Sequence, residues 1–362
     1  MTVRRQVRKR RGLIVRPEHP GRHTILVHVI MILIVTCASA GCLLVAQQSA
    51  GSGRDSPTGF PDQPGHAEVS GHPRIVCLTS DAAELLVAIG AGEDVIGVPE
   101  TLQTHHPRLL SRLPNARSVG SAKTPDVETI LALSPDLIIL SEAMQPSGEE
   151  KWRAAGIRTF AFECHRAQDL SGIALTLGNL TSHEKEAGDY AAFTQNLLDI
   201  IRRRLDSNPP ANPLRVYMES YTDYFVYGRD TGADDLLRFL HCINVGANQS
   251  LSSIRVSTEW VLAENPDIII KTTTLNSNRT LQSEYHRLIS RDGFSSLRAI
   301  RMNRTYIING DVFFSPHAAE GALYLAKKIY PDRFRDIDAS KFTRNYLQLF
   351  SGETDDVPVI FP

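Results

Sequence analysis

Aromatic and charged side chains are concentrated in one segment of the 362-residue chain, which reads YMESYTDYFVYGR from Tyr217 to Arg229. Tyr221, Tyr224 and Phe225 offer flat apolar area, with polar tips on the tyrosines. Arg229 can pair with a carboxylate or a phenolate. These side chains suit the aromatic or macrocyclic face of an anionic chelate. A β-hairpin-like edge with surface aromatics explains the segment equally well.

Other candidate binding residues follow the remaining predicted strands, because ligands of open α/β sheets bind outside the carboxyl ends of strands. These weaker candidates are Ser80, Asp81, Glu100, His105, His106, Lys123 and Arg255. We interpret His105 and His106 as a solvated loop, since direct metal binding normally needs three or four ligands with supporting groups. No such set is visible in the sequence, so we predict no metal site and favour a ligand whose metal is already chelated.

Catalytic motifs are absent from the sequence. It contains no GxxxxGK[ST], no GxSxG and no HExxH pattern. The stretch GAGEDVIG, from Gly90 to Gly97, lacks the third glycine of a dinucleotide-binding loop and is predicted to be a turn. We therefore expect a binding protein without catalysis and without a cofactor.

Short apolar runs alternate with helical patterns along the first half of the chain. Strands are predicted at residues 74–79, 95–98, 137–140 and 159–162, with a helix over 81–90. Such alternation indicates parallel strands joined by helical crossovers.

A duplicated segment extends this pattern to the second half. DVETILALSPDLII (126–139) and STEWVLAENPDIII (257–270) share seven identical residues of fourteen at an offset of 131. Each copy predicts a short helix, a Pro-Asp turn and a buried strand. A repeat at this distance indicates two similar α/β lobes rather than a solenoid.

A long helical pattern lies between the two halves, from His183 to about Asp206, and ends at Asn208-Pro209-Pro210. The predicted fold is α/β, with two Rossmann-like lobes joined by one long helix and a ligand cleft between them. We expect only modest closing motion from a single stiff connecting helix. The expected boundaries are 74–182 for the N-terminal lobe, 183–207 for the helix, 208–335 for the C-terminal lobe and 336–362 for a C-terminal helix and tail that pack on the rest.

The N-terminus has the pattern of a targeting segment. Residues 1–23 hold eight of the 39 Lys and Arg residues and one acid, which leaves 31 basic and 39 acidic residues for the rest. That acidic remainder argues against nucleic-acid binding. Residues 25–46 are apolar or small and carry no formal charge. Either they form a signal whose Ser39-Ala40-Gly41-Cys42 box is cleaved and lipidated at Cys42, or they stay as an uncleaved anchor.

Both interpretations of the N-terminus place the folded part outside the cytoplasm and tether it to the membrane. Residues 1–46 form the signal or anchor segment, and residues 47–73, rich in Gly, Ser and Pro, form a flexible linker. Beyond it, Cys77, Cys164 and Cys242 show no metal-ligand spacing. We predict buried thiols, with one disulfide and one free thiol as the alternative.

From Arg74 to Arg333 the chain resembles the substrate-binding proteins of iron–siderophore and cobalamin ABC importers. The resemblance rests on RIVCLTSDAAELLVAIG, VGS (119–121), PDVETILALSPDLII, VSTEWVLAENPDIII (256–270), the strand Thr305–Ile308 and a final helix over 318–329. It implies capture of a metal chelate, a ferric siderophore first and cobalamin or haem next. Delivery would be to an ABC permease and its ATPase.

The resemblance also assigns roles to individual residues. It implies that Glu128 and Glu259 dock onto arginines of the permease, for which bidentate Arg–carboxylate pairing is suited. Alternatively, each glutamate only complements the dipole of its own helix. Phe313 and Phe314 resemble the family's late cleft loop.

Two other classes of function remain open at this point. Metal chelatases share the two-lobe architecture, but such an enzyme would need a buried His/Glu pair in the cleft and usually a cytoplasmic address. A tethered ligand sensor or adhesion domain without an importer is the other class. Absence of a neighbouring permease gene would favour that one.

Overall fold

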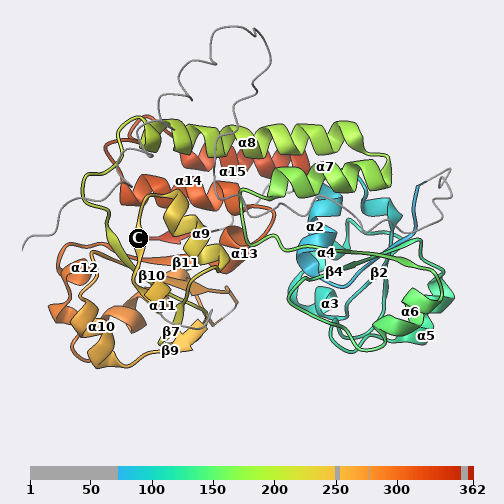
Figure 1. Ribbon diagram of the computed structural model, residues 1–362, viewed down its shortest axis with the longest axis horizontal. Helices are drawn as coiled ribbons and strands as arrows, with labels where there is room; N and C mark the ends of the chain where they lie inside the picture. The colour runs from blue at the N-terminus through green and yellow to red at the C-terminus, as the bar shows by residue number, and fades with distance from the viewer. Residues whose placement is uncertain (1–71, 249–252, 277, 352–357) are drawn as a thin grey trace, which may run out of the picture. The chain divides into compact units, whose positions relative to one another are not determined.

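The computed structural model describes residues 72–248, 253–276, 278–351 and 358–362 (Figure 1). Every described residue belongs to one compact unit, Pro61–Pro362. The predicted anchor over 1–46, with Cys42, and most of the predicted linker lie outside the described residues.

The N-terminal lobe is built on a five-stranded parallel sheet. Its strands are ordered β3 (Arg117–Ser118), β2 (Val95–Val98), β1 (Ile75–Cys77), β4 (Leu137–Leu140) and β5 (Arg158–Ala161). In β4, Leu137 and Ile139 join one core cluster, whereas Ile138 and Leu140 join another. The strand is apolar throughout because both faces of the sheet are covered. The helices of this lobe are α2 (Ser80–Ala88), α3 (Thr101–His105), α4 (Pro107–Leu110), α5 (Val127–Leu133), α6 (Glu149–Ala154) and α7 (Leu170–Thr181).

The C-terminal lobe contains a mixed seven-stranded sheet. Its order is β12 (Ile360–Phe361), β11 (Thr305–Asn309), β10 (Ile268–Thr273), β6 (Arg215–Glu219), β7 (Phe225–Tyr227) and β9 (Ser253–Arg255), and β8 (Ile243–Asn244) also pairs with β6. The strands β8, β6, β10 and β11 are parallel, whereas β7 is antiparallel to both its neighbours and β12 to β11. Its helices are α9 (Gly232–Phe239), α10 (Thr258–Glu264), α11 (Leu281–Ile289), α12 (Arg298–Arg301), α13 (Gly310–Phe313) and α14 (Ala318–Ile329). The predicted α/β fold with two parallel-sheet lobes is confirmed.

The long helix α8 (Glu184–Asp206) connects the lobes and buries side chains in both cores. Its 23 residues span about 34 Å at a rise of 1.5 Å per residue. Tyr190 packs in the N-terminal core and Ile201 in the C-terminal core. The neighbouring helix α7 approaches α8 so closely that a β-carbon on Gly178 would clash with Ala187. The predicted connecting helix is therefore present, and it is held by packing along its length.

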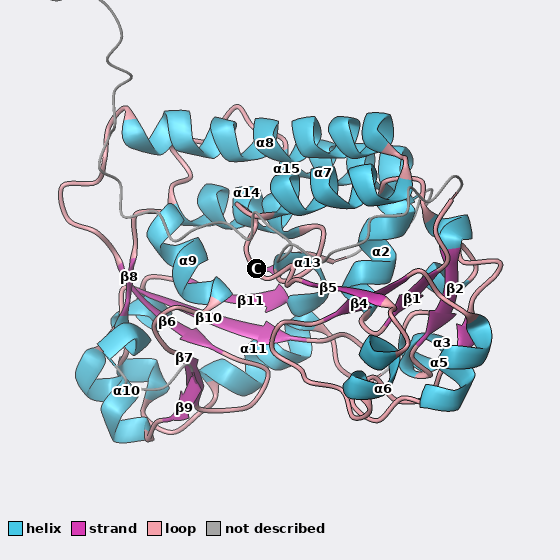
Figure 2. Ribbon diagram, turned by 45° about the vertical axis from the view of Figure 1, so that its right-hand side comes forward, coloured by secondary structure: helices cyan, strands magenta, loops and turns pink. Residues whose placement is uncertain are grey.

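The C-terminal segment is helical as predicted, but it also joins the lobes, which the sequence did not indicate. It consists of α15 (Ala339–Tyr346) and a π-helical turn, η4 (Leu347–Ser351). Ala339 packs in the C-terminal core, whereas Tyr346 and Phe350 reach the N-terminal core, with ring centroids 6.3 and 5.5 Å from that of Tyr190. Figures 1 and 2 show α8, α14 and α15 together on one side of the two sheets.

The sequence repeat is also a structural repeat. Both α5 and α10 have seven residues and end at a residue with left-handed backbone, Ser134 (φ 47°) and Asn265 (φ 39°). The thiols of Cys77, Cys164 and Cys242 are buried and free, as predicted.

Candidate ligand-binding site

A cavity of about 510 Å³ lies between the two lobes and is the candidate ligand site. Its walls are helix α2, the segment of α3 and α4 that follows β2, the loops that follow β5 and β6, the segment from α13 to the start of α14, and the segment of α15 and η4. These loops mostly follow the carboxyl ends of parallel strands, where open α/β sheets bind ligands. Six of the thirteen candidate residues line the cavity, namely Ser80, Asp81, His105, His106, Tyr221 and Phe314.

Carboxylates from both lobes line this cavity. Asp81 is placed by the start of α2, whose N-cap Thr79 accepts a hydrogen bond from the backbone N–H of Ala82. Burial raises the pKa of Asp81 to about 7, and the negative charges of Glu84 and Glu163 add to the shift. Burial also raises the pKa of Asp311, at the start of α13. Among the described residues, neither Asp81 nor Asp311 forms a salt bridge with a lysine or arginine.

Aromatic side chains of the C-terminal lobe form another part of the wall. The Tyr221 side chain lies beside Gly310 and is 42% exposed. Phe314 lies edge-on to the ring of His165, with centroids 6.4 Å apart, and 5.6 Å from the ring of Tyr227. The cavity therefore combines aromatic rings of the C-terminal lobe with carboxyl groups of both lobes.

Four histidines also line the cavity, and two of them were missed from the sequence. His105 is exposed, as expected of a solvated loop, but it and His106 lie on the cavity wall. His165 and His317 were not candidates. His165 follows β5, so applying the loop-after-strand rule to that strand would have found it. His317 follows the short helix α13, which the sequence did not predict.

His317 connects the two lobes across the cavity. Its Nε2 is 2.7 Å from Oε1 of Glu84 on α2, and its ring centroid is 3.9 Å from that of Tyr346. Its Nδ1 is 3.8 Å from Oε1 of the buried Glu320. Burial raises the pKa of Glu320 to about 8, although the charge of His317 partly opposes this.

The other predicted ligand-binding residues lie away from this cavity. The ring of Tyr224 packs under the guanidinium of Arg291, 4.5 Å from its centroid, and Tyr224 and Arg255 line a separate hollow beside Glu259. Phe225 pairs with Arg255 in the sheet. Tyr224, Phe225 and Arg255 do not line the inter-lobe cavity, so their contact with a ligand stays a prediction.

The remaining predicted residues have other surroundings. Arg229 donates from Nε to the carbonyl oxygen of Ala247 at 3.2 Å. Lys123 is exposed on the N-terminal lobe, and Phe313 is buried in the C-terminal core. The segment 217–229 contains the antiparallel pair β6 and β7, so the hairpin alternative describes its backbone, while its loop brings Tyr221 to the cavity.

A buried group of charged side chains holds the loop between β6 and β7 in place. The carboxylate of Glu219, at the end of β6, is fully buried and lies 2.8 Å from Nζ of Lys271 and 2.7 Å from Nη1 of Arg291. Both cations also contact Asp223, at 3.0 and 2.9 Å. Burial raises the pKa of Glu219, but Arg291 and Lys271 outweigh it, so the net shift is downward. The group was not predicted from the sequence. A lysine that directly follows three isoleucines in a buried strand, Lys271 in β10, is the signal that could have indicated it.

Glu128 and Glu259 occupy equivalent exposed positions on the two lobes. Each is the second residue of its helix, α5 or α10. The helix starts are capped alike: Asp126 accepts a hydrogen bond from the N–H of Thr129, and Ser257 accepts one from the N–H of Trp260. Hydrogen bonds from its own backbone N–H and from Ser257 lower the pKa of Glu259.

Comparison with known proteins agrees with this geometry. The family model described as periplasmic binding protein matches residues 75–312. The chain belongs to this family. A Bacillus subtilis relative, the uncharacterized ABC transporter substrate-binding lipoprotein YvrC, is 25% identical over 84% of this chain and 97% of its own length. The cobalamin-binding protein of Halobacterium salinarum is 26% identical over 70% of this chain and 69% of its own.

A solved structure supports the fold. The TroA-like periplasmic binding protein FepB from Veillonella parvula superposes with a TM-score of 0.70 at 19% identity, covering 82% of this chain and 96% of that one. The periplasmic binding protein described here is thus a substrate-binding component of an ABC importer for a small ligand. Among its described residues, no helix is both long and apolar enough to cross a membrane.

Proposed function

We propose that this periplasmic binding protein is held at the outer face of the cell membrane, captures a metal chelate in the inter-lobe cavity and delivers it to an ABC permease. The observation that carries the proposal is the cavity itself, which both lobes line with aromatic, histidine and carboxylate side chains. A pocket of this size with a few polar groups and apolar rings suits a small-molecule ligand.

The cavity wall carries Asp81, Glu84 and Asp311 beside two arginines and four histidines. Burial raises the pKa values of Asp81 and Asp311, so these carboxyl groups can both donate and accept hydrogen bonds. Such a wall suits a ligand rich in amide groups. A corrinoid, whose ring carries many amide side chains, is therefore our first candidate. A ferric hydroxamate siderophore is the second, and haem the third.

Delivery would use the acidic positions that the two lobes share. Glu128 and Glu259 are exposed at the same helical position in each copy of the repeat, so they offer two carboxylates for arginines of a permease. Attachment to the membrane rests on the apolar run 25–46, with lipidation of Cys42 as the favoured form, and a relative named as a lipoprotein supports it.

Titration calorimetry on the full chain in detergent micelles tests the proposal. The panel contains cyanocobalamin, a ferric hydroxamate, a ferric catecholate, haem, molybdate and free ferric ion. We expect one chelate to bind with a Kd of about 1 μM or tighter, and no measurable binding of free ferric ion. Failure of every chelate to bind would overturn the proposal and favour a sensor of another ligand.

Two tyrosines on the same loop provide matched variants. Tyr221→Ala removes a ring from the cavity wall and should weaken binding about tenfold or more. Tyr224→Ala removes a ring that packs on Arg291 and Phe294 outside the cavity, so it should lower stability but keep affinity. The reverse pattern would place the ligand in the hollow beside Arg255 instead.

A further inference from the structure

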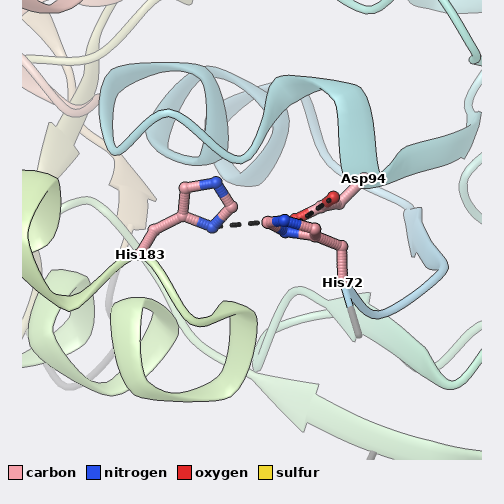
Figure 3. A group of neighbouring side chains, drawn as sticks. All are labelled: His72, Asp94 and His183. Carbon is pink, nitrogen blue, oxygen red and sulfur yellow. Dashed lines mark ion pairs between the residues drawn. The ribbon is translucent and has the colours of Figure 1, made fainter. Parts of the chain in front are cut away.

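Figure 3 shows a group of two histidines and one aspartate, His72, Asp94 and His183, whose side chains lie close together. His72 precedes β1, Asp94 directly precedes β2, and His183 directly precedes α8. Since β1 and β2 are parallel, these residues lie at the amino ends of the strands, whereas the cavity lies at the carboxyl ends. The group is therefore distinct from the site of the proposed function.

The spacing of this group matches that of ligands around one metal ion. One ligand atom from each residue lies within 4.8 Å of the other two. Nδ1 of His72 is 3.5 Å from Oδ1 of Asp94, and Nδ1 of His183 is 3.7 Å from Oδ2. Nitrogen and oxygen ligands about 2.0–2.2 Å from a tetrahedral zinc ion are roughly 3.3–3.6 Å apart. A direct hydrogen bond between such groups would instead be about 2.7–3.0 Å long.

The carboxylate of Asp94 supplies a second observation. Its side chain is only 7% exposed, and Oδ2 is inaccessible to solvent with no hydrogen-bond partner. A buried carboxylate oxygen normally has a donor or a cation beside it, because leaving it without one is costly. The imidazole nitrogens of His72 and His183 face this carboxylate from 3.5 and 3.7 Å, which is longer than an ordinary hydrogen bond.

His183 can bind a metal ion if its Nδ1 gives up the hydrogen bond that it makes without metal. Its Nδ1 is 2.7 Å from the carbonyl oxygen of Thr181, so in the metal-free arrangement this nitrogen donates to that carbonyl. Binding of a cation at Nδ1 replaces the hydrogen bond with a metal–nitrogen bond and moves the proton to Nε2. Neutral imidazole and carboxylate are ligands that zinc accepts.

We propose that His72, Asp94 and His183 bind a divalent transition-metal ion of the zinc type, with water completing the coordination. The ion would fasten the segment that leads into β1 to the start of the inter-lobe helix α8. It would therefore hold the first described residues of the chain against the helix that joins the two lobes. Sequence spacing could not reveal this site, because its ligands are separated by 22 and 89 residues.

Zinc titration of the full chain in detergent micelles, after removal of metal with EDTA, tests the proposal. We expect one equivalent of Zn²⁺ to bind with a Kd of about 1 μM or tighter and to raise the Tm. His72→Ala changes an exposed residue and should weaken zinc binding at least tenfold, and so should Asp94→Asn. His286→Ala, an exposed histidine far from the group in sequence, is the matched control and should bind zinc like the wild type.

The variants also show where the metal is held. X-ray absorption of the zinc complex should show two imidazole ligands, and one of them should disappear in His72→Ala. Circular dichroism without metal checks that both variants fold. Wild-type affinity in both His72→Ala and Asp94→Asn, or no saturable binding of one equivalent by the wild type, would overturn the proposal.

Discussion

The side chain of Tyr221 occupies the space that a side chain at Gly310 would need. A β-carbon on Gly310 would meet the Tyr221 hydroxyl and ring edge at less than contact distance. Tyr221 lies near the start of the loop that follows β6, and Gly310 begins α13 after β11, so two strands of one sheet place an aromatic ring at the cavity.

Gly310→Ala should therefore move Tyr221 without altering its chemistry. We expect the affinity for the chelate to fall about fivefold to fiftyfold, because a ring that packs against the ligand is displaced. Gly188→Ala on α8 is the matched control, since nothing lies within 4 Å of the added carbon. Calorimetry on both variants checks this, and equal affinities would show that Tyr221 makes no contact with the ligand.

Glu128→Ala combined with Glu259→Ala should stop uptake but leave ligand affinity unchanged. Both carboxylates are exposed and lie outside the cavity lining, so their loss removes charges from a docking surface only. Radiolabelled chelate uptake by cells and calorimetry on the purified protein provide the two readouts. Equal loss of affinity would contradict the docking role, and so would undiminished uptake.

Glu320→Gln should remove part of the pH dependence of stability. Burial raises the folded-state pKa of Glu320 to about 8 from an ordinary value of 4.5, so the folded state holds a proton that the unfolded state releases. This group therefore lowers the free energy of unfolding progressively as pH rises from about 4.5 to 8. We expect the variant to match the wild type near pH 4.5 and to exceed it at pH 9, as measured by urea unfolding. A constant difference at all pH values would contradict a protonated Glu320.

Lys271→Met should destabilise the protein by about 3 kcal/mol or more, because it removes one cation from a buried, charge-balanced group. Glu219 and Asp223 would then share Arg291 alone on the inner side. Arg153→Ala breaks the exposed pair with Glu149 and should cost less than about 1 kcal/mol. Urea unfolding of both variants gives the comparison, and equal costs would show that the buried group contributes no more than a surface pair.

Much of the fold could be predicted from residue patterns, because buried strands and capped helices leave local signals. The paired segments around Glu128 and Glu259 predicted two lobes, and the three- and four-residue spacing around Tyr190 predicted α8. The structure adds a relationship that the alignment of the two segments lacked. Asp136 accepts a hydrogen bond from the backbone N–H of Arg74 at 2.8 Å, and Asp267 accepts the equivalent one from Arg215 at 2.9 Å.

The ligand site was less accessible to sequence reasoning, because a cavity depends on how loops distant in sequence meet. Ser80 was found by the loop-after-strand rule, Tyr221 by the aromatic character of its segment, and Phe314 by its resemblance to the family's late cleft loop. Tyr224 was a reasonable candidate by type, but its backbone has φ 62° and its ring turns to Arg291. Burial and direction of a side chain in such a loop are tertiary properties, so neither can be inferred from residue type.

The second connection between the lobes, through α15 and η4, affects how an importer distinguishes loaded from empty binding protein. Both α8 and the α15–η4 segment are packed in the two cores, so opening the lobes widely would bend both segments, and that cost accompanies every large rotation. The empty and the loaded receptor should therefore present almost the same pair of acidic contacts to the membrane partner. Empty copies of the binding protein would then compete with loaded copies for the permease. At low ligand concentration, the amount of binding protein would therefore limit the rate of import.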